Sequence, residues 1–304
     1  MIYEFAVEPR VMIDWKDALI ISNGISLNNG RLVSDFPTNW DREAHQQCKR
    51  AEISTMSLNR SVECIARIKR YLLKSSRPYQ DTSEWLQNAL EQDGVIPFRA
   101  IIVGEREKPV PKVLQVEDLT DENVFWAVPR QVEVVRTARD MAHHVEQLTQ
   151  LSSTVKFVDP HFCADQWRFT NPLMRFIDAA LKNSRTPAKL FEYHYSYESY
   201  DASEAHVSQL VRQRVLRSLP AGVRLVFYRW KRRHDSPEFH DRFVLTEIGG
   251  YKFGQGLDEN DVVGQPSHVV ITLLEESIRA SMWKRFDVGT ADLDLEGNPI
   301  SITS

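Results

Sequence analysis

The spacing of hydrophobic positions changes along the chain and divides it into regions. Over the first forty residues, short apolar runs alternate with turn residues at 22–24 and 28–30, which predicts short strands joined by hairpins. Across residues 41–75, apolar side chains recur at three- and four-residue steps, which predicts one or two amphipathic helices. A further helix is expected over residues 82–92 and a buried strand over residues 98–103. This region is therefore expected to be a small α+β domain.

The second half of the chain has a different rhythm. A helix is predicted from residue 132 to about residue 152, and strands then alternate with helices. We expect strands over residues 154–158, 189–195, 223–230 and 269–272, two more flanking Gly249 and Gly250, and helices over residues 173–182, 205–219 and 273–286. Strands separated by helical patterns of ~10–15 residues predict a mixed α/β sheet flanked by helices. The predicted domains are residues 1–130, an accessory α+β domain, and residues 131–304.

The composition is that of a folded chain without a strong charge bias. Of 304 residues, 42% are hydrophobic and 26% are charged, close to the averages for globular proteins. The formal net charge is −4, so the chain as a whole lacks the basic excess of a protein that coats nucleic acid. Any binding of phosphate is therefore expected to be local.

Cysteine use and hydropathy favour a reducing, aqueous compartment. Cys48, Cys64 and Cys163 are widely spaced and form no CxxC pair, so we expect reduced thiols. No cluster of histidine, cysteine and acidic residues has metal-ligand spacing, so neither a metal nor another cofactor is expected. The sequence shows no secretory signal pattern, and no stretch approaches the ~18–20 apolar residues of a membrane span. A cytoplasmic location without membrane attachment is the resulting expectation.

One stretch, residues 237–258, gathers the groups that phosphoryl transfer needs. If it begins as a strand, alternation projects His240 and Arg242 from one face, so that a nucleophile and a cation share a surface. Glu247 follows a short apolar run and supplies a carboxylate to orient an imidazole. These side chains form a candidate catalytic group that uses no metal.

The same stretch resembles the phospholipase D superfamily signature, in which His-x-Lys is followed after four residues by Asp, and after six more by Gly-Ser and then Asn. His240, Arg242, Glu247, Gly254 and Asp258 stand at the corresponding positions. His240 and Gly254 are identities. Arg242 replaces the lysine, Glu247 the aspartate and Asp258 the asparagine. Arginine keeps a phosphate-binding cation, whereas Asp258 would place a negative charge near a phosphate.

The resemblance covers about residues 150–290 and implies an α/β fold of the phospholipase D type. The strand predicted before Asp159 looks like the first strand of such domains, which often ends in Asp-Pro-aromatic. Gly254 and Gly256 permit close approach of the backbone to a bound anion. Together with Asp258 and Asp159, they are expected to bind substrate.

The resemblance also implies a two-step mechanism. His240 attacks phosphorus and forms a covalent phosphohistidine, which divides one difficult displacement into two. Arg242 neutralises the charge that develops on the phosphoryl oxygens, and Glu247 orients an imidazole. A second histidine, in the family usually from another copy of the motif, protonates the leaving oxygen and then activates water.

The sequence contains only one copy of the motif, so the second histidine needs a source. A homodimer that places two His240 side chains across a two-fold axis is the simplest completion. The alternative donors within the chain are His161, His194 and His234.

Local basic character favours nucleic acid as the substrate class. Basic and aromatic residues are interleaved just before the motif: Arg224, Phe227, Tyr228, Arg229, Trp230, Lys231, Arg232 and Arg233. Such a patch can hold a polyanion and stack bases, with Arg232 as a candidate contact. The same pattern also fits one face of a half-buried strand with its charges at the wet end.

The leading hypothesis is a metal-independent nuclease whose N-terminal domain recognises a partner or target. One alternative is a catalytically degenerate phospholipase D-like domain that binds phosphate-rich ligands or scaffolds a complex. Another is an enzyme acting on phospholipids or small phosphodiesters.

Overall fold

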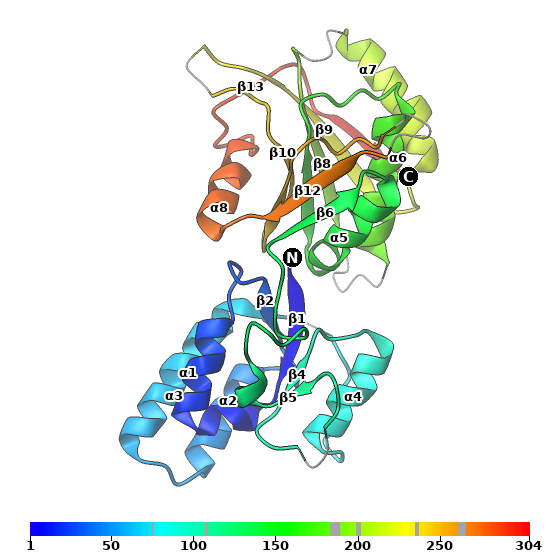
Figure 1. Cartoon of the computed structure of the whole chain (residues 1–304). Coiled ribbons are helices and arrows are strands. Elements are labelled where there is room, and N and C mark those ends of the chain that lie inside the picture. Colours follow the sequence, from blue (N-terminus) through cyan, green and yellow to red (C-terminus); the bar gives the residue numbers. More distant parts are fainter. Residues whose placement is uncertain (75, 107–108, 183–188, 199–201, 235–236, 261–265) are drawn as a thin grey trace. The chain divides into compact units, whose positions relative to one another are not determined.

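A computed structural model of the chain describes residues 1–304 except 75, 107–108, 183–188, 199–201, 235–236 and 261–265 (Figure 1). The chain divides into two compact units. One comprises Ile2–Arg130, and the other comprises Gln131–Ser304 together with Met1. Within the described residues, no helix combines the length and hydrophobicity needed to cross a bilayer.

The N-terminal unit is built on a sheet whose named strands all run parallel. The strands are β1 (Tyr3–Val7), β2 (Arg31–Ser34), β3 (Leu72–Leu73), β4 (Ile101–Ile102) and β5 (Val113–Leu114). Their spatial order is β3-β2-β1-β4-β5, and each neighbouring pair is parallel. The order reverses between β1 and β4, as it does in doubly wound α/β sheets.

Helices cover both faces of this sheet (Figure 1). They are α1 (Trp15–Gly24), α2 (Trp40–Arg50), α3 (Thr55–Ile68) and α4 (Trp85–Val95), with short 3-10 segments at Pro9–Ile13, Lys69–Tyr71 and Val116–Asp118. The predicted α+β domain is wrong, because the named strands of this sheet are all parallel. Of the predicted hairpin turns, the one at residues 28–30 is present, where Ser26 and Arg31 form an isolated antiparallel bridge, and the one at residues 22–24 is wrong. Asp14 caps α1 by accepting a hydrogen bond from the backbone N of Lys16, so a helix replaces the first predicted hairpin.

The C-terminal unit contains a second, mixed sheet. Its strands are β6 (Gln131–Val135), β7 (Thr154–Val158), β8 (Leu190–Ser196), β9 (Arg224–Lys231), β10 (Arg242–Thr246), β11 (Gly250–Phe253), β12 (His268–Leu273), β13 (Asp294–Leu295) and β14 (Ile300–Thr303). The spatial order is β13-β9-β8-β7-β10-β11-β12-β6, and β14 also pairs with β9. Strands β7, β8 and β9 are parallel, and the other pairs are antiparallel.

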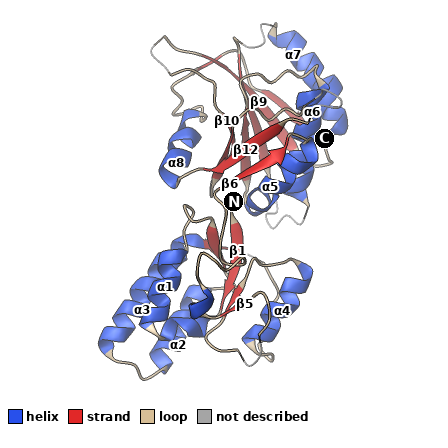
Figure 2. Cartoon of the chain, viewed as in Figure 1, coloured by secondary structure: helices blue, strands red, loops and turns tan. Residues whose placement is uncertain are grey.

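Helices flank this sheet on both faces (Figure 2). They are α5 (Ala138–Leu151), α6 (Trp167–Leu181), α7 (Glu204–Leu210) and α8 (Glu276–Arg285), and a π turn at Val211–Val215 and a 3-10 turn at Leu216–Ser218 continue α7. The expected mixed α/β sheet flanked by helices is confirmed. The helix predicted from residue 132 is wrong in its first turn, because β6 pairs there with β12 and α5 begins only after Thr137.

Aromatic packing fixes the two layers of helices to the sheet. On one face the Phe157 ring of β7 stacks on Phe176 of α6, with ring centroids 5.6 Å apart. On the other face, Phe243 and Leu245 of β10 join an apolar cluster that Trp283 of α8 packs against. Because side chains alternate along a strand, Arg242 belongs to the α5/α6 face while Phe243 anchors the opposite one.

Candidate active site

The register of two neighbouring strands brings the sequence-predicted residues together. Strands β7 and β10 are antiparallel, with Val158 paired to Phe243. One step beyond that pair, Asp159 directly follows β7 and lies opposite Arg242, the first residue of β10. Two segments that are more than eighty residues apart in sequence therefore meet at one edge of the sheet.

Asp159 is the fixed point of this edge. The residue is 1% exposed, and its carboxylate accepts hydrogen bonds from the backbone N of Leu257 at 2.8 Å and of His161 at 3.0 Å. Burial raises the pKa of Asp159, although these two hydrogen bonds and the charge of Arg242 oppose the shift. Asp159 thus holds two loops in place, which is a positioning role.

Arg242 carries unused hydrogen-bonding capacity. Its side chain is half-buried at the start of β10, and its Nε atom is buried without a hydrogen-bond partner among the described residues. Buried polar groups are nearly always paired, so this nitrogen keeps donor capacity that a ligand could use. A guanidinium with free donors matches the geometry of a phosphate, so Arg242 forms the centre of a candidate anion site.

Two exposed imidazoles lie near this guanidinium. His240 precedes Arg242 by two residues, and its side chain is 65% exposed. Burial lowers the pKa of His161, and the charges of Arg242 and His240 lower it further, whereas the charge of Asp159 opposes the shift. His161 and His240 are therefore within electrostatic range of each other and of Arg242.

The environment of His240 differs from the prediction in two respects. Strand β10 begins at Arg242, so His240 lies in the extended segment before the strand. Its Nε2 atom lies 2.8 Å from a carboxylate oxygen of Glu238, which sequence analysis had not selected. The contact could have been predicted, because side chains two residues apart in an extended segment, such as Glu238 and His240, point to the same side.

Glu247 was predicted to orient an imidazole, and this prediction is wrong, because its carboxylate lies at the other end of β10 from Arg242. It follows the last residue of β10, five residues beyond Arg242, which is about 17 Å along a strand. Its carboxylate instead accepts hydrogen bonds from the backbone N of Ser153, from Ser153 Oγ at 2.8 Å and from Thr154 N at 3.2 Å. Glu247 therefore caps the start of β7.

Asp258 is neutralised by two arginines that sequence analysis missed. Arg136 forms a close ion pair with one carboxylate oxygen and donates from Nε to the Asp258 carbonyl at 3.0 Å. Arg168 lies 3.7 Å from the other oxygen. Arg136 follows β6 and Arg168 belongs to α6, so their spacing in sequence gave no signal. The Asp258 carboxylate thus does not leave an unpaired negative charge at the site.

The two predicted glycines have different roles. A Cβ atom on Gly256 would overlap the carboxylate of Asp258 and lie 3.4 Å from Asp159, so glycine is required there. A Cβ atom on Gly254 would meet the Val270 carbonyl at 3.5 Å, which is an ordinary contact. The expected approach of the backbone to a bound anion stays a prediction at both glycines, because these neighbours belong to the protein itself.

Arg232 lies at the rim of the site. Its backbone N donates to Glu198 at 3.0 Å, and its guanidinium lies 3.7 Å from Glu238. Glu238 therefore links Arg232 to His240, while both side chains of the Arg232–Glu238 pair stay largely exposed to solvent.

His194 is excluded from contact with substrate by its burial. The side chain is 1% exposed and lies on the face opposite to Arg242. Trp230 Nε1 donates to His194 Nδ1 at 3.0 Å, and His194 Nε2 lies 3.2 Å from Glu192. Lys156 lies 3.3 Å from the same Glu192 oxygen. This arrangement fixes the neutral Nε2–H tautomer, and burial lowers the pKa of His194.

Among the residues that the structure describes, no group of three or more His, Cys, Asp or Glu side chains is placed to hold a metal ion. The three cysteines are buried and form no disulfide with one another.

No family model and no curated protein matches this sequence. Among solved structures, the chain is similar to Nuc of Salmonella typhimurium, a phospholipase D family member, with a TM-score of 0.34 and 9% identity over 55% of this chain and 98% of that one. It is also similar to TrmBL2, an archaeal chromatin protein whose structure shows a novel mode of DNA binding. That TM-score is 0.26, with 8% identity over 81% of this chain and 84% of that one. Both TM-scores are below 0.5, so neither likeness bears on function.

Proposed function

We propose that the C-terminal unit is a phosphodiesterase that acts on nucleic acid through a phosphohistidine intermediate. One observation carries the proposal: the buried Nε of Arg242 has no hydrogen-bond partner among the described residues, and two exposed imidazoles lie within electrostatic range of this guanidinium. This combination offers a cation for a phosphate, a nucleophile and a separate proton donor.

In the first step, His240 attacks phosphorus with the ring nitrogen that faces away from Glu238. A nitrogen–phosphorus bond forms and the bond from phosphorus to the leaving oxygen breaks. Arg242 binds the non-bridging oxygens, where negative charge develops, and Glu238 stabilises the imidazolium of His240. His161, in its protonated form, gives its proton to the leaving oxygen.

In the second step, water attacks the phosphohistidine. Neutral His161 takes a proton from that water, and the bond between His240 and phosphorus breaks. His240 leaves as a neutral imidazole, and His161 is again protonated. The lowered pKa of His161 suits a group that must both give and accept a proton under mildly acidic conditions.

His161 is our choice for the second histidine because it belongs to the same unit as His240, and because the charge of His240 lowers the pKa of His161. The homodimer expected from the sequence would supply a second His240 instead. His194 is enclosed in the core. His234 is exposed, and no ion pair or hydrogen bond of its side chain is found among the described residues.

Nucleic acid is the proposed substrate class because four different segments of the chain each contribute an arginine to the site. These are Arg136, Arg168, Arg232 and Arg242. Such a group of guanidinium side chains suits a polyanion. The N-terminal unit is proposed to recognise a partner or target. A cavity of about 700 Å³ lies beyond the ends of β1 and β2, lined in part by Arg10, Asn39 and Arg42.

The experiment that tests the mechanism uses the His161→Gln variant and bis(4-nitrophenyl) phosphate. Nitrophenolate leaves without a proton, so the first step should survive while hydrolysis of the intermediate slows. We expect a burst of one nitrophenolate per site and a phosphorylated His240, identified by mass spectrometry at alkaline pH. A variant that turns over steadily without a burst, or a label on another residue, would contradict the assignment. A catalytically degenerate domain would bind the diester and release nothing.

A further inference from the structure

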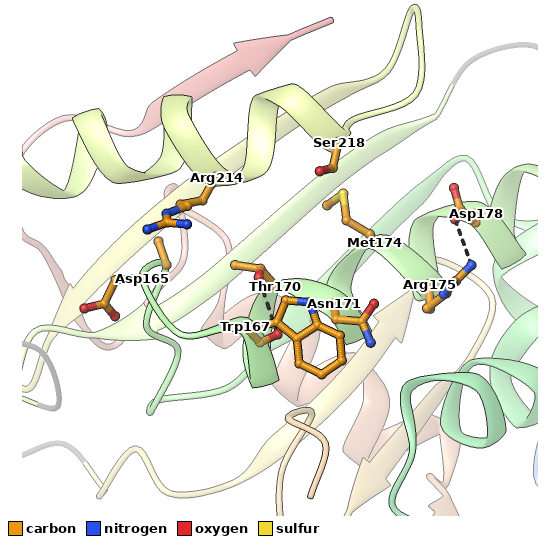
Figure 3. A pocket seen from close by; sticks show the side chains of 10 residues that line it. Asp165, Trp167, Thr170, Asn171, Met174, Arg175, Asp178, Arg214 and Ser218 are labelled. Carbon is orange, nitrogen blue, oxygen red and sulfur yellow. Dashed lines mark hydrogen bonds and ion pairs between the residues drawn. The ribbon is translucent and has the colours of Figure 1, made fainter. Parts of the chain in front are cut away.

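A groove lies beside the proposed active site in the C-terminal unit. Helix α6 forms one wall and the turns at Val211–Val215 and Leu216–Ser218 form the other (Figure 3). The cavity measures about 410 Å³, which is within the range of sites for small ligands. Its size suits one nucleotide unit better than a folded partner.

One wall of the groove presents an exposed aromatic ring. Trp167, the first residue of α6, is 66% exposed. Every other Trp, Tyr and Phe in the described part of the chain is buried or half-buried. A single exposed apolar residue needs no explanation by itself, but this ring lines a cavity with polar groups opposite to it.

The opposite wall presents a cation. Arg214 extends from the π turn into the groove, across from the α6 residues Trp167 and Thr170 (Figure 3). No ion pair or hydrogen bond of the Arg214 side chain is found among the described residues. Asp165 also lines this space, and its carboxylate accepts a hydrogen bond from the Cys163 thiol at 2.8 Å. The groove therefore offers a ring face and free guanidinium donors together.

The groove and the active site share the first turns of α6 as a common support. Arg168 follows Trp167 directly and contacts Asp258 at 3.7 Å. Asn171, which lines the groove, donates to the carboxylate of Glu259 at 2.8 Å, and Glu259 N donates to the Arg168 carbonyl at 2.9 Å. The same short segment thus supports the site on one side and the groove on the other.

We propose that this groove binds an unpaired base of the substrate, so that the enzyme acts on single-stranded nucleic acid. The base stacks on Trp167, and Arg214 contacts the adjoining phosphate. Stacking on a protein ring requires a free base face, which a duplex covers with its own neighbouring bases. The inference rests on the proposed function, because the nucleic-acid strand that enters the groove is the one whose phosphate is bound at Arg242.

The test measures binding in a His240→Ala background, which prevents cleavage. Fluorescence anisotropy compares three labelled ligands: a 12-residue oligothymidine, an abasic 12-mer of equal charge and a 12-base-pair duplex. Trp167→Leu removes the aromatic face and keeps apolar area, whereas Trp167→Phe keeps the face. Val288→Ala, at a residue 58% exposed elsewhere in the same unit, is the control.

We expect Trp167→Leu to weaken binding of the oligothymidine by roughly 5- to 150-fold, the range for loss of one stacked base. Trp167→Phe and Val288→Ala should stay within about threefold of the parent, and the abasic ligand should not distinguish Trp167→Leu from the parent. Arg214→Gln should weaken the oligothymidine and the abasic ligand alike, because its contact is to phosphate.

Equal affinity of Trp167→Leu and the parent for oligothymidine would overturn the inference. So would an equal loss on the abasic ligand, a duplex bound as tightly as the single strand, or a parent that binds none of the three. Turnover of bis(4-nitrophenyl) phosphate by the wild-type chain, measured in parallel, tests the proposed function separately, since that substrate carries no base.

Discussion

At the scale of single residues, the site depends on one guanidinium, that of Arg242, whose buried Nε has no hydrogen-bond partner among the described residues. Nearby carboxylates already have partners: Asp159 holds two backbone amides, and Asp258 is paired with Arg136. Arg242 therefore keeps its donors for a ligand. Leaving a buried donor unsatisfied costs about 1–3 kcal/mol, a cost that a bound phosphate would remove.

Removing this guanidinium should reduce catalysis more than folding. We expect Arg242→Gln to lower kcat/KM for a phosphodiester by about 10²- to 10³-fold, as for loss of a donor to a developing oxyanion. Arg242→Lys should be intermediate, because it keeps the charge without the planar fork. Arg139→Gln, at an exposed position on α5, is the control. Equal kcat/KM for all three variants would remove Arg242 from the mechanism.

Substitutions of Glu238 and Glu247 should have different effects, one on catalysis and the other on stability. Glu238→Gln should lower kcat and shift the pH profile, because it removes the carboxylate that contacts His240. Glu247→Gln should leave kcat unchanged and lower the free energy of unfolding by about 1 kcal/mol, since its bonds to Ser153 and Thr154 are structural. Steady-state kinetics and urea unfolding of both variants measure these effects. The opposite assignment of effects would restore Glu247 to the site.

At the scale of elements, the sequence predicted the strands that carry the motif but not their surroundings. The apolar run after Arg242 and the turn at Gly249 correctly indicated β10 and β11, because alternation and turn residues are local signals. The placement of Arg136 and Arg168 could not be predicted, since it depends on β6 and α6 meeting the residues after β11. Glu247 stands at the expected spacing in the sequence, but its carboxylate bonds to Ser153 and Thr154. Spacing in a motif therefore did not predict where that side chain lies.

The buried His194 of β8 should make the stability of the C-terminal unit depend on pH. The folded pKa of His194 is lowered by burial, so the unfolded chain binds its proton first as the pH falls through about 6.5. The free energy of unfolding should therefore fall by up to about 1.4 kcal/mol per pH unit below that value. His194→Gln should flatten this slope.

Urea unfolding between pH 5 and 7 measures the slope, and an NMR titration of the His194 ring provides an independent check if the variant folds poorly. The ring should titrate below pH 6.5 and carry its proton on Nε2 when neutral, because a proton on Nδ1 would break the bond from Trp230. A ring that titrates at 6.5 or above would refute the assignment.

At the scale of the whole molecule, the question is whether one chain completes the site. His161 and His240 belong to the same unit, so the proposed mechanism needs no second copy. A two-fold dimer that shares two His240 side chains needs both protomers intact.

Mixed preparations distinguish these two assemblies. When wild-type chains are co-expressed with His240→Ala chains, a site completed within one chain predicts activity proportional to the wild-type fraction. A site shared across a two-fold axis predicts a steeper fall, because mixed dimers lose activity. Measured activity against the fraction of wild-type chain, with sedimentation to establish the assembly state, decides between His161 and a second His240.

The most direct test of the central claim is hydrolysis of single-stranded DNA in excess EDTA by the wild type and by His240→Ala, purified identically. His45→Ala, a histidine of the N-terminal unit, is the matched control. The proposed site predicts that the wild type and His45→Ala cleave in EDTA, and that His240→Ala loses activity by at least about 10³-fold because the covalent step is lost. Equal cleavage by His240→Ala, or wild-type cleavage that stops in EDTA and returns with Mg²⁺, would contradict it.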